Sequence, residues 1–136
     1  MYTFEDLKIG NLFHDKIKVN EQSIKDFSNA SGDKNPIHLN EEFAKKTIFK
    51  ERIAHGMLIA SFISSVIGNK FPGPGTIYVS QSLQFKKPVK INDIVDVEIK
   101  VNNLLDGKKW CELSTRCYVK KDLVLDGNAL VIPPRK

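Results

Sequence analysis

The chain has 136 residues, 41% of them hydrophobic and 27% charged, with a formal net charge of +5. This length suits one domain with a single hydrophobic core, so residues 1–136 are expected to fold as one unit. The longest apolar run, Met57 to Phe62, is interrupted by a serine and is far too short to span a bilayer. The first ten residues lack the apolar stretch of a secretory signal. The expected location is therefore the cytoplasm, away from any membrane.

The positive charge is compatible with an anionic partner, but its distribution argues against nucleic acid. The basic residues are scattered along the chain in small groups, such as the lysine pairs at 45–46, 86–87, 108–109 and 120–121. Aromatic residues are not interleaved with them, and no recognition-helix pattern is present. Charge alone does not choose among the other anionic ligands, such as a phosphorylated small molecule.

The two cysteines predict a protein that is not held together by a disulfide. Cys111 and Cys117 lie six residues apart in a segment of alternating polarity. On one extended strand they would be about 20 Å from each other, which is too far for a disulfide. Two cysteines are also too few for a metal cluster. We interpret them as small apolar side chains in a reducing compartment.

The first third of the chain predicts one strand and two helices. A strand over Leu12–Val19 is followed by a helix that Asn20 caps and Gly32 ends. Asn40 can cap a second, short helix on the surface. Acidic residues in its first turn and basic residues later follow the order that the helix dipole favours.

Residues 31–38, Ser-Gly-Asp-Lys-Asn-Pro-Ile-His, place a carboxylate and an imidazole five residues apart. Gly32 interrupts the preceding helix, and Pro36 pushes its neighbour out of the α region. The segment is therefore expected to be neither regular helix nor regular strand. A bend there can turn Asp33 and His38 toward one cavity, and this pair of groups can activate a water. Such segments are also common turns whose side chains cap their own backbone, so a purely structural role stays open on these residues alone.

The next helix is expected to be buried. It runs from about Gly56 to Val66 or Ile67, with apolar residues over most of its circumference. Its serines, at 61, 64 and 65, form a narrow stripe of small residues that fits close packing against a sheet or a partner. Gly68 and the Pro- and Gly-rich loop 71–75 end the helix.

From Thr76 onward the hydrophobic period changes to two. Alternating segments cover 77–85, 95–101 and 111–119, and Leu123 to Ile132 supplies a last strand. Asp106-Gly107 is a strong hairpin signal between two of them. A buried helix followed by a series of such strands predicts an α+β fold, with an antiparallel sheet wrapped around a long central helix.

Four segments, 27–38, 54–58, 75–78 and 81–89, together carry a family resemblance. They include the Gly-Asp-x-Asn-Pro-x-His element at 32–38 and a His-Gly pair that opens the buried helix about twenty residues later. Over nearly its whole length the chain resembles the MaoC-like, (R)-specific enoyl-CoA hydratases of the hot-dog fold. The resemblance implies a single hot-dog domain, a homodimer formed by joining two sheets edge to edge, and an acyl tunnel beneath the central helix.

The resemblance also implies the residues of an active site for the syn addition of water to an enoyl thioester. Asp33 takes a proton from the water, and His38 binds that water and returns a proton to the α-carbon. The Gly56 N–H is the oxyanion donor for the thioester carbonyl, which fits the free N–H groups and dipole of a helix start. Ser64 matches the family position whose hydroxyl lies against the aspartate, although packing explains a serine there equally well. The substrate is an acyl-CoA, and no metal or redox cofactor is needed.

Other polar residues have simpler interpretations. His55 is expected to orient or cap the start of the buried helix, His14 to be solvated, and Asn35 to shape its loop. The lysines around Pro88 could meet CoA phosphates, but none of them is singled out. The alternatives are a dehydratase acting on acyl carrier protein or a branched acyl-CoA, and a non-catalytic acyl-CoA-binding domain. A base in the pocket argues against the last of these.

Overall fold

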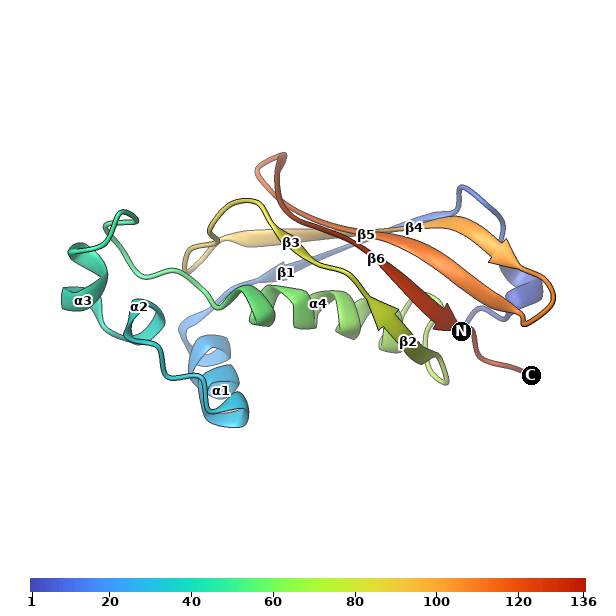
Figure 1. Ribbon diagram of the computed structural model, residues 1–136, viewed down its shortest axis with the longest axis horizontal. Coiled ribbons are helices and arrows are strands. Elements are labelled where there is room, and N and C mark those ends of the chain that lie inside the picture. Colours follow the sequence, from blue (N-terminus) through green and yellow to red (C-terminus); the bar gives the residue numbers. More distant parts are fainter.

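The computed structural model describes residues 1–136 as an antiparallel sheet of six strands with one long helix, α4 (Gly56–Asn69), along one face (Figure 1). Three shorter helices lie beyond the N-terminal end of α4, and both chain termini lie near its other end. The α+β class and the central helix are therefore as predicted. The strand order is β1 (Leu12–Lys18), β4 (Ile94–Leu105), β5 (Trp110–Val119), β6 (Asp122–Ile132) and β2 (Ile77–Gln81), while β3 (Gln84–Phe85) pairs with β6.

The two predicted helix caps near the N-terminus are confirmed. After a 3-10 turn at Phe4–Asp6 and strand β1, Asn20 starts α1 (Glu21–Ser31) by accepting a hydrogen bond from the Ser23 N–H at 2.8 Å. Gly32 ends α1 in the left-handed conformation, with a φ of +79°. Asn40 likewise caps α3 (Glu41–Lys45) by accepting from the Phe43 N–H at 2.9 Å.

The segment between these helices corrects one expectation. Residues 31–38 were predicted to contain no regular helix, but Pro36–Leu39 forms one helical turn, α2, which carries His38. The Asn35 side chain caps this turn by accepting from the Ile37 N–H at 3.2 Å. Pro36 occupies the first helical position, where its missing N–H costs nothing. The proline therefore starts a helix here instead of preventing one.

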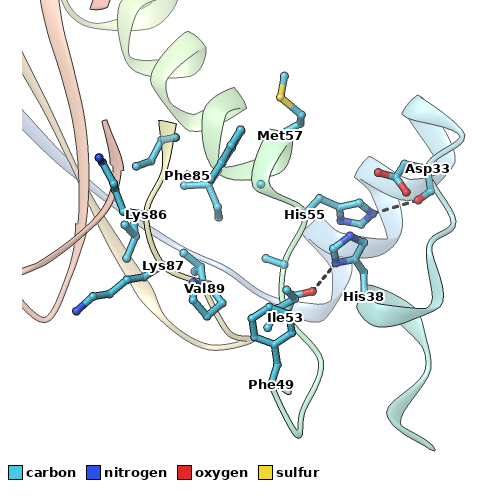
Figure 2. Close-up of a pocket in the computed structure, with 16 residues that line it drawn as sticks. Asp33, His38, Phe49, Ile53, His55, Met57, Phe85, Lys86, Lys87 and Val89 are labelled. Carbon is cyan, nitrogen blue, oxygen red and sulfur yellow. Dashed lines mark hydrogen bonds between the residues drawn. The ribbon is translucent and has the colours of Figure 1, made fainter. Parts of the chain in front are cut away.

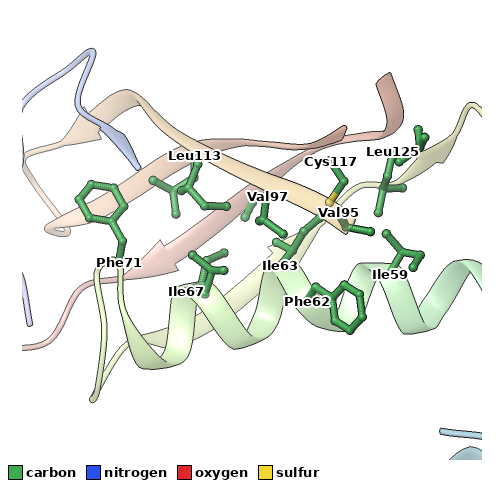
Figure 3. Close-up of a cluster of buried hydrophobic side chains, with 14 of the residues drawn as sticks. Ile59, Phe62, Ile63, Ile67, Phe71, Val95, Val97, Leu113, Cys117 and Leu125 are labelled. Carbon is green, nitrogen blue, oxygen red and sulfur yellow. The ribbon is translucent and has the colours of Figure 1, made fainter. Parts of the chain in front are cut away.

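Helix α4 forms the centre of the core (Figure 3). Its sheet-facing side chains are all buried and pack against apolar residues of β4 and β5 (Leu58, Ile59, Phe62, Ile63, Val66 and Ile67). The helix continues to Asn69, past the predicted end at Val66 or Ile67, because Gly68 is accommodated inside it. The serine stripe lies on the exposed side. No helix in the chain, α4 included, has the length and apolarity that crossing a membrane requires.

The sheet follows the predicted strands with one exception. Asp106-Gly107 lies in the turn between β4 and β5, as expected. The single strand expected over 77–85 is instead divided into β2 and β3, which both pair with β6 and are separated at Ser82 and Leu83. A Cβ at Gly127 of β6 would lie 1.9 Å from the Ser82 carbonyl oxygen, so only glycine allows the chain to pass this close to β6. The apolar side chains of β2 and β3, predicted to be half-buried, are largely exposed.

Candidate active site

His38 is held on the α2 turn by contacts with the segment that leads into α4. Its Nδ1 lies 2.7 Å from the Ile53 carbonyl oxygen, which can only accept, so Nδ1 carries a proton (Figure 2). The Arg52 Nε donates to the His38 backbone carbonyl at 2.8 Å. In the neutral ring the second nitrogen, Nε2, is therefore a bare acceptor.

The surroundings of His38 favour its neutral form. Burial lowers the pKa of this imidazole below its usual value. The Ile53 carbonyl raises the pKa, the nearby His55 lowers it, and the Asp33 carboxylate raises it. Because burial is the largest of these effects, His38 is ready to accept a proton at neutral pH.

Asp33 follows the αL residue Gly32, and its side chain is exposed. Its Oδ1 accepts a hydrogen bond from the Asn35 N–H at 3.2 Å, so Asn35 shapes the loop, as predicted. A carboxylate oxygen of Asp33 lies within 4.8 Å of a ring nitrogen of His38. One water with two hydrogen bonds of about 2.8 Å each spans such a separation. The structure therefore brings Asp33 and His38 together.

Gly56 is the first residue of α4 and leaves its N–H without an acceptor, as does Met57. These free donors, at the positive end of a 14-residue helix, suit an oxyanion. A Cβ at this position would lie 2.7 Å from the Phe85 ring, so a larger residue would have to displace that side chain. Phe85 was not singled out in the sequence, and only the folded chain places it over the helix start.

A cavity of 520 Å³ joins these groups (Figure 2). Asp33, His38 and Gly56 all line it, together with mostly apolar side chains and the lysines of the loop after β3 (Phe49, Ile53, Ile59, Phe85, Lys86, Lys87, Val89, Val124 and Leu125). Its size is that of a small-molecule site. The cavity thus combines an apolar lining with a water-activating pair, a free backbone donor and two cationic side chains.

Ser64 is the one predicted site residue that the structure does not bring to this cavity. It lies on the exposed side of α4, two turns beyond Gly56, and does not line the cavity. No hydrogen bond joins it to Asp33 within the chain. A role for its hydroxyl stays a prediction.

His55 occupies a more central place than its predicted capping role. It makes no side-chain cap on α4 and is almost fully buried, at 1% exposure. Its ring stacks on His38 with centroids 3.9 Å apart and planes 29° apart, and its Nε2 donates to the Asp33 carbonyl oxygen at 3.1 Å. The sequence shows that His55 directly precedes the helix. It does not show that His55 stacks on His38, because the two residues belong to separate segments that only the fold brings together.

The cluster of Asp33, His38 and His55 has the side-chain types of a metal site, but its geometry does not suit one. The nitrogen lone pairs of histidine lie in the ring planes, and these two rings are stacked nearly face to face. Their lone pairs therefore run side by side instead of converging on one ion. In addition, Nδ1 of His38 and Nε2 of His55 both carry protons directed at backbone carbonyls. The arrangement fits proton transfer better than metal binding.

Comparison with known proteins finds relatives that match nearly the whole chain. Residues 8–122 match the family described as MaoC like domain. An (R)-specific enoyl-CoA hydratase of Rhodospirillum rubrum is 45% identical over 100% of this chain and 94% of its own length. A 3-hydroxybutyryl-CoA dehydratase of Methylorubrum extorquens is 44% identical over 98% of this chain and 85% of its own. Among solved structures, an unliganded R-hydratase of Pseudomonas aeruginosa superposes with a TM-score of 0.94 at 38% identity, covering 98% of this chain and 86% of that one.

Proposed function

The chain belongs to the family of MaoC-like domains, and we propose that it adds water reversibly to trans-2-enoyl-CoA thioesters to give (R)-3-hydroxyacyl-CoA. It is a hydro-lyase with a hot-dog fold. The observation that carries the proposed substrate and chemistry is the convergence of three groups on one cavity. These groups are the bare Nε2 of His38, the Asp33 carboxylate and the free Gly56 N–H.

The hydrogen bonding of His38 refines how the proton moves. Because Nδ1 donates to Ile53, neutral His38 has no proton on Nε2 to give away. We therefore assign the first transfer to Nε2, which takes one proton of the water while the Asp33 carboxylate accepts a hydrogen bond from the other. The water oxygen bonds to the β-carbon as the double-bond electrons move toward the thioester oxygen. The imidazolium then returns the proton to the α-carbon.

The Gly56 N–H stabilises the charge that develops on the thioester oxygen during this reaction. Its N–H has no acceptor inside the chain, so it is available to the substrate without breaking an existing hydrogen bond. The packing of α4 into the core fixes the donor before the substrate arrives. Such a preorganised donor is worth roughly 10²–10³-fold in rate.

Two alternatives are a dehydratase that acts on acyl carrier protein and a domain that binds acyl-CoA without catalysis. The relatives at 44% and 45% identity are named for CoA thioesters, which favours CoA over acyl carrier protein. A domain that only binds acyl-CoA has no use for a buried imidazole with a lowered pKa and a bare nitrogen in its cavity. The lysines at 86 and 87, which line the cavity, suit the phosphates of CoA.

The proposal is tested by incubating the purified protein with crotonyl-CoA and following loss of the enoyl absorbance. We expect hydration, and chiral analysis should give only the (R)-3-hydroxybutyryl thioester. Formation of the (S) isomer would contradict the proposed stereochemistry. An enzyme that is inactive with crotonyl-CoA but active with the crotonyl thioester of acyl carrier protein would reassign the carrier.

We further propose that the chain forms a homodimer through the free edge of β2. Ile77, Val79 and Phe85 expose 57%, 42% and 53% of their surface on β2 and β3, and Met57 on α4 exposes 54%. An unpaired strand edge with apolar side chains is an unstable surface for a monomer, and a second copy covers it symmetrically. Light scattering at micromolar concentration should give twice the chain mass, and Val79→Lys should reduce it. A wild-type protein that is monomeric under these conditions would contradict the proposed dimer.

We propose a cytoplasmic location, which the state of the two thiols supports. Cys111 and Cys117 are both buried and unpaired on β5. Burial raises the pKa of each thiol to about 12. They act as core side chains, which suits a reducing compartment.

A further inference from the structure

We propose that His55 is a positioning residue for the hydration reaction. With a proton on Nε2, it holds the Asp33 loop and the His38 ring in the arrangement that binds one water. This inference rests on the proposed hydratase function and assigns a role to a buried histidine that the mechanism above does not use.

The first contact of His55 fixes the loop that carries Asp33. Its Nε2–H donates to the Asp33 backbone oxygen at 3.1 Å, and the Ser28 hydroxyl donates to the same oxygen at 2.8 Å. The Asp33 side chain is exposed and bonded only to the Asn35 N–H of its own loop. The backbone oxygen is thus one anchor of this loop, beside the Asp33 N–H, which donates to the Ser31 hydroxyl at 3.1 Å.

The second contact fixes the ring of His38. The two imidazoles lie against each other (Figure 2), with centroids 3.9 Å apart. The Phe27 ring also packs on His55, with centroids 4.9 Å apart. The hydrogen bond from His38 Nδ1 to Ile53 fixes one edge of the His38 ring, and the stack restrains its face. Together they hold the direction in which Nε2 points.

The position of the His55 proton follows from the surroundings of its two nitrogens. Nε2 faces a carbonyl and must carry a proton, whereas Nδ1 is buried and has no hydrogen-bond partner. A proton on Nδ1 would be a buried donor without an acceptor. The charged groups nearby are the Asp33 carboxylate, which accepts from its own loop, and Arg52, which binds the His38 carbonyl and Glu21. Neither is hydrogen-bonded to Nδ1, so the geometry favours the tautomer with its proton on Nε2.

His55 also precedes Gly56 directly, so it joins the water-activating pair to the oxyanion donor. A shift of its ring would move the Asp33 loop and His38 relative to the Gly56 N–H. Misplacements of about 1 Å cost roughly 100-fold in rate, even when every reacting group is present. Loss of His55 should therefore lower turnover without weakening ligand binding.

Two substitutions separate the contacts of His55. His55→Gln keeps a donor near the position of Nε2 but removes the ring, whereas His55→Phe keeps the ring but removes the donor. We expect each to lower kcat for crotonyl-CoA by roughly 10–100-fold, with KM changed by less than about threefold. His14→Gln on strand β1, outside the cavity, is the matched control and should keep the wild-type rate.

The split between kcat and KM distinguishes positioning from a merely structural role. Turnover is expressed per folded molecule, with the folded fraction of each variant taken from its melting curve. Positioning predicts a lower kcat per folded molecule with KM nearly unchanged. If His55 only supports folding, activity should fall in proportion to the folded fraction and kcat per folded molecule should keep the wild-type value, which would overturn the inference.

A measurement on the wild-type protein keeps the inference testable even if the variants fold poorly. Nitrogen-15 NMR of the histidine rings at pH 8 should show the proton of His55 on Nε2. A proton on Nδ1 instead would overturn the inference. A wild-type enzyme without hydratase activity would instead contradict the proposed function, and the two failures are thus distinguishable.

Discussion

The two ends of α4 show opposite uses of the same helix. Toward its C-terminal end, Ile63, Val66 and Ile67 are each 1% exposed and pack against the sheet. At its N-terminal end, the N–H groups of Gly56 and Met57 have no acceptors and face a cavity. Unsatisfied donors cost free energy, so the end that carries them must be held by interactions elsewhere. The buried C-terminal end therefore stabilises the helix, and this stability allows the N–H groups at the other end to stay free for a ligand.

The largest effect on stability should come from the buried end. Ile67→Ala removes side-chain atoms from a fully buried position and should lower the free energy of unfolding by about 2–5 kcal/mol. Turnover per folded molecule should stay near the wild-type value, because the cavity lies at the other end. Asn69→Ala, at the exposed last position of α4, is the control and should change stability by less than about 0.5 kcal/mol. A stable Ile67→Ala protein with low turnover would contradict this division of roles.

A substitution at the N-terminal end of α4 should mainly lower the turnover. Gly56→Ala pushes a Cβ into the Phe85 ring, which lies 2.7 Å from where that atom would be. Overpacking costs about 1–3 kcal/mol, which corresponds to a loss in turnover of about 5- to 150-fold if it displaces the donor. Phe85→Leu in the same chain should restore part of this loss, with Phe85→Leu alone as control. Equal activity of Gly56→Ala with and without Phe85→Leu would show that the glycine is needed for the ligand alone.

A smaller effect should appear in the pH dependence of stability. Burial lowers the pKa of His38 below its usual 6.5 in the folded chain, so the unfolded chain binds its proton more readily. The stability contributed by neutral His38 is complete above pH 6.5 and is lost as the pH falls through the folded-state pKa. The melting temperature of the wild type should therefore fall more between pH 7 and pH 5 than that of His38→Gln. Parallel curves over this range would contradict the lowered pKa.

Much of the fold could be predicted because its signals are local. The caps Asn20 and Asn40 each sit next to the backbone that they satisfy, and the Asp106-Gly107 turn joins adjacent strands. The pairing of β1 with β4 had no such signal, since it depends on residues about eighty positions apart. The division of the 77–85 segment was also unpredictable, because it accompanies a close approach of Ser82 to Gly127 on another strand.

The residues of the candidate site also form two groups, those with a local signal in the sequence and those without one. Asp33 and His38 share one short motif, and Gly56 opens a recognisable helix, so these three could be named from the sequence. The stacking of His55 on His38 and the packing of Phe85 on Gly56 join segments that are distant along the chain. The importance of these two residues depends on contacts made in the folded chain. A single histidine or phenylalanine in the sequence does not reveal such contacts.

The central claim is that Asp33 and His38 act on one water, and a mutant cycle tests it most directly. Hydration of crotonyl-CoA is measured for Asp33→Asn, His38→Gln and the double mutant, with melting temperature and acyl-CoA binding on the same proteins. Each single change should lower turnover by roughly 10²–10⁴-fold, with folding and binding retained. The double mutant should lose much less than the product of the two, because residues that handle one water act as a unit. A folded, ligand-binding Asp33→Asn protein that hydrates crotonyl-CoA at the wild-type rate would contradict the claim.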